Sequence, residues 1–218
     1  MVKKSIDFKG EPLRETVVKA LEFIGVDVDD FVLKTEYFSV PNIRNHDQGH
    51  LYRVMLDCAL IALKVDEKRK GLLAFCGAFI HDLAKHSSGD SEEHGPRAAE
   101  QKWDMFNHIW EKYNLTEEER NIVRAAVCRH SRGRNNYAHE DSVVNNILHD
   151  ADAFDRARFR HKNDRLNWNY LNHPDLKVQH GHVGRMTKIL IGETEAVWCF
   201  TKDANPNTSF REYISNIR

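Results

Sequence analysis

Apolar residues recur every three or four positions along most of the chain, which is the spacing expected on one face of an α-helix. The first such segment covers residues 13–24 and is followed by Gly25, a residue type that commonly ends helices. Further helical patterns cover residues 50–61, 72–80, 98–110, 122–127 and 142–152. The sequence lacks a convincing set of strands in which apolar and polar residues alternate. The pattern therefore predicts an all-α bundle.

Residues that favour helix starts lie where several of these patterns begin. Asp47 or Asn45 is placed to cap the helix that carries the second pattern. Pro96 suits the first turn of the helix that carries the fourth pattern. Residues 116–119, Thr-Glu-Glu-Glu, have the form of a capping box, in which the threonine and the third glutamate each accept a backbone hydrogen bond. These local signals support the helical assignment.

The chain is long enough, at 218 residues, to form one sizeable domain without a disulfide or a structural metal. We expect a single domain over residues 1–218, with a core at about 45–158 and a C-terminal helical extension at 186–218. Residues 160–185 lose the helical pattern and contain several asparagines. They predict a long loop or insertion near the C-terminal third, of a kind that often has a function such as a lid.

The charges are balanced, with 32 basic and 33 acidic residues and a net charge of −1. Nucleic acid, if bound, would therefore need a local basic patch. The four cysteines lie far apart, which indicates free thiols in a reducing compartment rather than a zinc ribbon or a disulfide framework. No segment approaches the roughly 20 apolar residues of a membrane span, and the N-terminus has no hydrophobic signal core. We expect a cytoplasmic protein with no membrane partner.

The segment 79–85 places the imidazole of His81 beside the carboxylate of Asp82 at the end of an apolar run. Helical spacing of the preceding apolar residues puts this pair at or near the C-terminal end of a buried helix. Side chains attached to a packed core are held rigidly, which favours metal binding. An adjacent histidine and aspartate also occur by chance, so the pair alone has little weight.

Other candidate ligands precede and follow this pair on predicted helices. His50 lies upstream, His130 follows the fifth apolar pattern, and Asp152 follows in the sequence Asp-Ala-Asp at 150–152. This order of His, His-Asp, His and Asp resembles the HD superfamily of metal-dependent phosphohydrolases, over about half of the chain. The resemblance implies an all-α HD-domain helical bundle and an enzyme that hydrolyses phosphate esters.

The resemblance also implies a set of metal ligands from three helices: His50, His81, Asp82 and Asp152. Two nitrogens and two oxygens suit a divalent ion, Mn²⁺, Fe²⁺, Co²⁺, Ni²⁺, Zn²⁺ or Mg²⁺, with one or two ions per chain. His46, four residues before His50, could share its helical face, but His50 fits the family's first histidine better. Asp150 competes with Asp152, because the family's Asp-Ala-Asp-Arg-Leu pattern continues here as Ala153-Phe154.

Residues around the ion are assigned further roles by the same resemblance. Binuclear relatives add histidines between the His-Asp pair and the last aspartate, where this chain has His94 and His130; alternatively, these two bind phosphate or support a ligand. Lys85 occupies a position from which a lysine contacts phosphate in some relatives. We expect catalytic roles for Asp82, Lys85 and His130, and substrate-binding roles for Lys85, His94, Arg132 and Arg156.

The expected function is hydrolysis of a small phosphomonoester, phosphodiester or phosphoanhydride, preferably of a nucleotide, by a metal-activated water. The chain lacks the markers of alarmone and cyclic dinucleotide hydrolases. The alternatives are a nuclease acting on single-stranded nucleic acid, a diiron oxygenase and a non-catalytic nucleotide sensor. Nucleic acid is the less favoured partner, and a homo-oligomer is compatible with the sequence.

Overall fold

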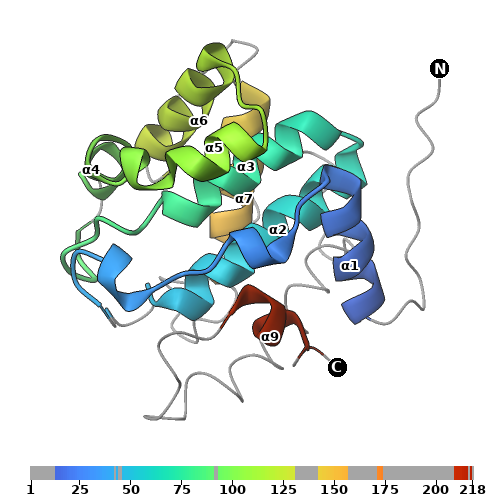
Figure 1. Ribbon diagram of the computed structural model, residues 1–218, viewed down its shortest axis with the longest axis horizontal. Coiled ribbons are helices and arrows are strands. Elements are labelled where there is room, and N and C mark those ends of the chain that lie inside the picture. The colour runs from blue at the N-terminus through green and yellow to red at the C-terminus, as the bar shows by residue number, and fades with distance from the viewer. Residues whose placement is uncertain are drawn as a thin grey trace.

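The computed structural model describes residues 13–41, 43, 46–90, 93–130, 142–156, 171–173, 209–215 and 217. These residues form eight α-helices and three 3-10 turns and contain no β-strand, which confirms the all-α prediction (Figure 1). The elements are α1 (Leu13–Ile24), η1 (Val28–Asp30), η2 (Thr35–Tyr37), α2 (Gln48–Val65), α3 (Lys68–Ile80), α4 (His94–Gln101), η3 (Trp103–Phe106), α5 (Asn107–Lys112), α6 (Glu117–Arg129), α7 (Ser142–Asp155) and α9 (Phe210–Ser215).

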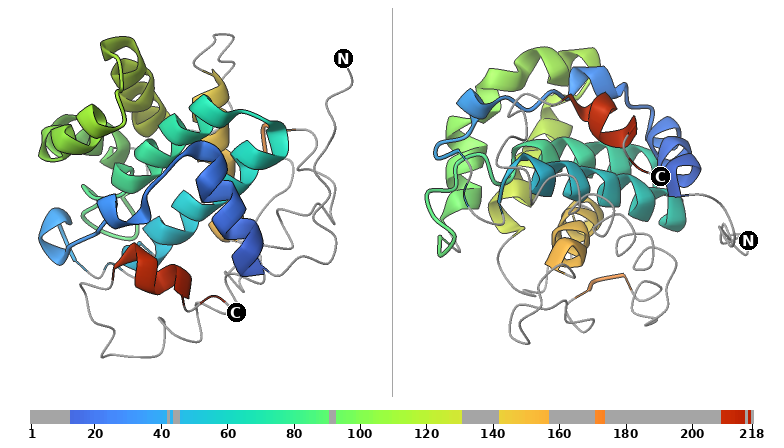
Figure 2. Two further views of the ribbon diagram at one scale, coloured as in Figure 1. Left: turned by 45° about the vertical axis from the view of Figure 1, so that its right-hand side comes forward. Right: turned by 90° about the horizontal axis from the view of Figure 1, so that it is seen from below.

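Helices α2 and α3 form the centre of the bundle. Residues 48–63 of α2 are all buried, so this helix is covered on every side, as expected of an interior helix. Helices α1 and α7 pack on α2, while α6 and α7 pack on α3. In the right-hand view of Figure 2, α7 lies on one side of the α2–α3 pair, and α1 and α9 lie on the other.

The turn between α2 and α3 brings the two helices into close antiparallel contact. Asp66 ends α2 in the left-handed conformation, with φ of 59°. A β-carbon added at Gly71 would lie only 2.2 Å from the β-carbon of Ala62, so the glycine permits the close approach. Because the helices are antiparallel, the N-terminal end of α2 faces the C-terminal end of α3. His50 and His81 therefore meet at the end of the hairpin opposite its turn.

The predicted caps of α2 and α6 are present. The carboxylate of Asp47 accepts a hydrogen bond from the backbone of His50 at 3.0 Å. At the start of α6, the Thr116 hydroxyl accepts from the Glu119 backbone, and the Glu119 carboxylate accepts from the Thr116 backbone. Both helices therefore begin where the local sequence signals place them.

The single helix predicted over residues 98–110 is wrong, because α4, η3 and α5 divide this segment. Trp103 and Trp110 would lie about 10 Å apart along the axis of one continuous helix. Their rings instead stack with centroids 4.8 Å apart, and the Trp110 indole donates a hydrogen bond to the Trp103 carbonyl at 3.1 Å. The break after α4 allows both large rings to be buried together.

The C-terminal helix α9 packs against the central pair through aromatic residues. The ring of Phe210 stacks on that of Tyr52 with centroids 4.6 Å apart. Of the predicted loop or insertion, only residues 171–173 are described, and of the predicted extension, only 209–215 and 217. The rest of both segments lies outside the described residues, and the domain boundaries stay a prediction.

Two further features bear on the sequence-based expectations. The described residues contain no helix with both the length and the apolar character needed to cross a membrane. The cysteines in the described part of the chain are free thiols, with Cys58 and Cys76 buried and Cys128 half-buried.

Candidate metal centre

His50, in the first turn of α2, is held by a buried carboxylate. Its Nδ1 lies 2.5 Å from Oδ2 of Asp155, and Nε of Arg53 donates to the other oxygen of that aspartate at 2.5 Å. The pair with Arg53 favours an ionised Asp155, which accepts the proton on His50 Nδ1. The other ring nitrogen, Nε2, then carries no proton and offers its lone pair as an acceptor in the interior.

His81 directly follows α3 and is fixed in the same way. Its Nδ1 donates a hydrogen bond to the carbonyl of Ala78 at 2.7 Å, which leaves Nε2 as the acceptor. Burial lowers the pKa of His81 to about 3, so the ring is neutral near pH 7. The Nε2 atoms of His81 and His50 lie 3.3 Å apart. Two facing lone pairs repel each other, and a cation between them would relieve this repulsion.

Asp82 lies between two groups of histidines, one at each of its oxygens. Oδ2 is 2.6 Å from Nδ1 of His46 and 3.3 Å from Nε2 of His50. Oδ1 is 3.0 Å from Nε2 of His94 and 3.6 Å from Nε2 of His130. Burial opposes ionisation of Asp82, but the surrounding histidines outweigh it and hold the pKa of Asp82 well below its usual range. These contacts favour the ionised form of Asp82 in the interior.

His94 and His130 form a second histidine pair, with Nε2 atoms 3.0 Å apart. His130 Nδ1 donates to the carbonyl of Val127 at 2.7 Å, so its Nε2 is also an acceptor. Neither Nδ1 of His94 nor Oδ1 of Asp82 has a hydrogen-bond partner among the described residues, although both atoms are buried. Such atoms require an explanation, and a bound cation beside Asp82 provides one for its carboxylate.

The two aspartates that competed for the last ligand position have different surroundings in the structure. Oδ1 of Asp152 lies 3.5 Å from Nε2 of His50. Asp150 instead accepts hydrogen bonds from the backbone of Asn172 at 2.7 Å and from Nδ1 of His173 at 2.7 Å. Burial raises the pKa of Asp150, but these bonds and one from the neighbouring histidine lower it to about 2. Asp150 thus anchors residues 171–173, where His173 is partly buried.

The cationic residues predicted to bind substrate are only partly described. Nζ of Lys85 lies 3.9 Å from Oδ1 of Asp82, and the side chain is 6% exposed. Arg156 is exposed at the end of α7. Burial raises the pKa of Asp152, but the nearby histidines and, after them, the charge of Arg156 lower it below its usual range. Arg132 lies outside the described residues.

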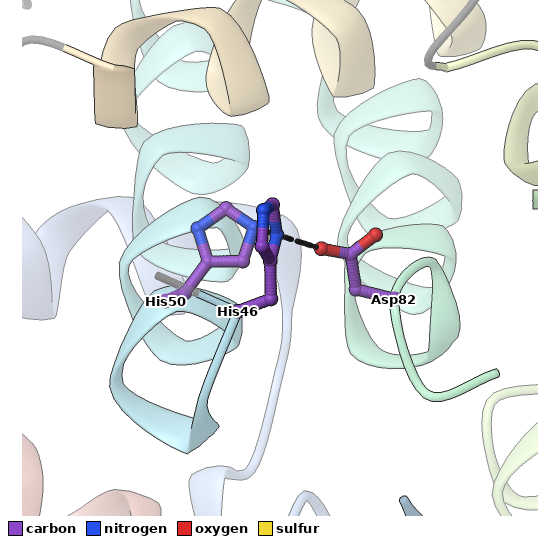
Figure 3. A group of neighbouring side chains, drawn as sticks. All are labelled: His46, His50 and Asp82. Carbon is purple, nitrogen blue, oxygen red and sulfur yellow. Dashed lines mark hydrogen bonds and ion pairs between the residues drawn. The ribbon is translucent and has the colours of Figure 1, made fainter. Parts of the chain in front are cut away.

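The ligand atoms form three overlapping groups, in each of which all atoms lie within 4.8 Å of one another. The groups are His46, His50 and Asp82 (Figure 3); His50, His81 and Asp152; and His81, Asp82 and His130. Neutral imidazoles with a fixed tautomer and ionised carboxylates are the donors that Mn²⁺, Fe²⁺, Co²⁺, Ni²⁺ and Zn²⁺ bind. The donor set therefore fits a divalent ion, and its shared members could hold more than one.

A comparison with protein families matched the HD domain model to residues 48–157, about half of the chain. The chain belongs to the HD domain family. The family is part of a superfamily of metal-dependent phosphohydrolases, and HD domains bind divalent metals, so the resemblance inferred from the sequence is confirmed. No curated protein and no solved structure matched the chain.

The HD domain of this chain contains supporting residues that the sequence reasoning missed. Asp155 and Arg53 hold His50, yet neither was assigned this role beforehand. A signal for both exists in the sequence, because Asp155 follows Asp152 by three positions and Arg53 follows His50 by three. Residues three apart share a helical face. The same reasoning placed His46 outside the ligand set, although it contacts Asp82.

Proposed function

We propose that this HD domain protein is a metal-dependent phosphohydrolase that acts on a small phosphate ester, preferably a nucleotide. The observation that carries the proposal is the convergence of two fixed histidine lone pairs, on His50 and His81, beside two ionised carboxylates. The ligands are His50, His81, Asp82 and Asp152. A bound divalent ion supplies a water of lowered pKa and neutralises charge on a phosphoryl oxygen.

The chain's own residues would fix and supplement this chemistry. Asp155 and Ala78 hold the tautomers of His50 and His81, so that both nitrogens are ready to bind without rearrangement. The ammonium group of Lys85 would stabilise the negative charge that develops on a phosphoryl group. Its small exposed fraction supports this role, because a charge shielded from water acts more strongly.

A second ion would be held by His94, His130 and Oδ1 of Asp82. The two oxygens of Asp82 face different histidine pairs, which supports one bridging carboxylate between two ions. In two-metal hydrolases the ions stabilise the attacking and the leaving oxygens. If this position holds no metal, the same two histidines could contact a substrate phosphate instead. They lie beside Asp82, which is a ligand of the first ion, and the phosphate would bind at that ion.

The near-neutral net charge favours a small substrate over a nucleic acid. Cytoplasmic location stays an inference from the cysteines, which are free in the described part of the chain. The second candidate function is a diiron oxygenase, favoured by the additional histidine pair at 3.0 Å. Iron content with oxygen consumption would distinguish it from a hydrolase.

Elemental analysis of the purified protein tests the proposal, with Asp82→Asn beside the wild type. Asp104→Asn is the matched control, because the side chain of Asp104 is 82% exposed. We expect the wild type and the control to carry transition metal and to release phosphate from nucleotides or p-nitrophenyl phosphate. Asp82→Asn should lose both properties. A wild type that stays metal-free after Mn²⁺, Co²⁺ and Zn²⁺ are offered would contradict the proposal.

A further inference from the structure

His46 lies just outside the matched HD region, two residues before its first residue. Its Nδ1 is 2.6 Å from Oδ2 of Asp82, and its ring meets that of His50 edge to face with centroids 5.2 Å apart. Figure 3 shows the ring of His46 beside that of His50, with one ring nitrogen directed at the carboxylate of Asp82. Its side chain is 21% exposed, whereas those of His50 and Asp82 are 2% exposed. His46 therefore lies on the solvent side of the centre.

The backbone of His46 is placed by the start of α2. The backbone N–H of His46 donates to the carbonyl of Ile43 at 2.9 Å, and the next residue, Asp47, caps the helix. This local structure turns the side chain toward the end of α3 rather than toward solvent. Because the backbone on both sides of His46 is held in place, the side chain has the preorganisation that a metal ligand requires.

We propose that His46 is a further metal ligand, which binds the same divalent ion as His50 and Asp82. The inference rests on the metal centre of the proposed function. The three ligand atoms lie within 4.8 Å of one another, which is close enough to surround one ion. Because Nε2 of His50 has a single lone pair, it can bind only one ion. His46 therefore adds a ligand to the ion that His50 holds.

The additional ligand changes which ions the centre should prefer. His50, His81, Asp82 and Asp152 alone would fill a tetrahedral zinc site. His46 is grouped with His50 and Asp82, so an ion that also keeps His81 and Asp152 would have five protein ligands and a sixth position for water. Mn²⁺, Fe²⁺, Co²⁺ and Ni²⁺ accept six ligands more readily than Zn²⁺ does. The class of ion implied by His46 is therefore a six-coordinate transition metal.

Equilibrium dialysis of metal-free full-length protein against Co²⁺ tests the role of His46. The variants are His46→Ala, which removes the ring, and His46→Asn, whose amide retains a hydrogen-bond donor near Nδ1 but binds transition metals poorly. His108→Asn, on the exposed surface of α5, is the control. Far-ultraviolet circular dichroism of the metal-free proteins checks that each variant is folded.

We expect both His46 variants to bind Co²⁺ at least about 10-fold more weakly than the wild type and the control. The visible absorption of the remaining bound Co²⁺ should become stronger, because the coordination number falls. If His46→Asn binds Co²⁺ like the wild type, His46 only orients Asp82 and the inference is wrong. If His46→Ala binds more tightly, His46 blocks the site and the inference is again wrong.

The two proposals fail in different ways. A wild type that binds no Co²⁺ overturns the metal centre itself, and with it the role of His46. A wild type that binds Co²⁺, together with an Asp82→Asn variant that does not, supports the centre. If the His46 variants then match the wild type in affinity and absorption, only the inference about His46 is overturned.

Discussion

The interaction of His50 with Asp155 shows how a residue that need not touch the ion can prepare a ligand for it. Asp155 is fully buried and contacts both His50 and Arg53. The carboxylate keeps the proton on Nδ1, so Nε2 stays unprotonated and can act as a ligand. Buried charges are tolerated when each has a partner, and the Arg53–Asp155 pair meets this condition. Support of the ligand and support of the fold are thus combined in one aspartate.

Asp155→Asn should weaken metal binding and destabilise the fold. Loss of the carboxylate is expected to reduce Co²⁺ affinity about 10- to 100-fold, because the His50 tautomer is no longer fixed. Arg53 would also be left without its buried counter-charge, a change that typically costs about 3–5 kcal/mol. Equilibrium dialysis and urea unfolding measure the two effects. Unchanged affinity in a folded variant would show that Asp155 does not prepare His50.

At the scale of elements, the second histidine pair depends on how closely α4 approaches α6. A β-carbon added at Gly95 would lie 2.5 Å from the carbonyl oxygen of Val127 and 3.3 Å from Cε1 of His130. That carbonyl is also the acceptor that fixes Nδ1 of His130. The glycine therefore permits both the contact between the helices and the orientation of the histidine.

Gly95→Ala should disturb the second pair and leave the first intact. The new methyl group must displace a backbone carbonyl, and overpacking of this kind costs about 1–3 kcal/mol. In a two-ion centre, bound Co²⁺ should fall from two ions per chain toward one, as measured by elemental analysis after dialysis. Gly89→Ala is the control, since its β-carbon would meet nothing within 4 Å. Retention of both ions by Gly95→Ala would argue against this role.

The start of α6 is stabilised by a charged pair that predicts a pH dependence. The hydrogen bonds from Arg69, at 2.6 and 2.5 Å, are the main cause that lowers the pKa of Glu119 from 4.5 to about 2. Because the folded state binds this proton more weakly, the stabilisation is complete above pH 4.5 and is lost as the pH falls toward 2. Solvent screening limits it to about 1 kcal/mol.

Urea unfolding of wild type and Glu119→Gln at several pH values tests this expectation. The wild type should be more stable than the variant at pH 6, and the difference should shrink between pH 4.5 and about 2. Glu22→Gln, which neutralises an exposed carboxylate on α1, serves as the control. A difference that stays constant with pH would show that the charge of Glu119 is not responsible.

For the whole molecule, the sequence predicted two kinds of feature with different success. Features set by residues adjacent in the sequence were predicted better than features set by packing between distant residues. The caps at Asp47 and Thr116 follow local rules and are confirmed. The break between α4 and η3 depends on two tryptophans that stack only in the folded chain. The choice of Asp152 over Asp150 beside His50 likewise depends on where residues 171–173 pack. No periodicity in the sequence carries that information.

The position of α9 links the C-terminal end of the described chain to the central helices. Phe210 is fully buried against Tyr52, while the neighbouring Arg211 pairs with Asp29 at an exposed site. Phe210→Ala should lower the free energy of unfolding by about 3–5 kcal/mol, because it removes a buried aromatic ring. Thermal and urea unfolding measure this loss. Arg211→Ala should have a much smaller effect, and equal effects would mean that the ion pair, not the ring, holds α9.

The contact between Gly71 and Ala62 is a point about which α2 and α3 could tilt relative to each other, and a small tilt there would displace the far end of α2. The contact lies near the turn, and His50 is about 18 Å away along α2, at 1.5 Å per residue over the 12 positions that separate it from Ala62. A tilt of about five degrees at this pivot moves the helix end by about 1.5 Å. Misplacement by about 1 Å can reduce the rate of an enzyme about 100-fold. A single methyl group added at Gly71, remote from every proposed ligand, would therefore displace His50 and lower the rate of any reaction at the metal centre.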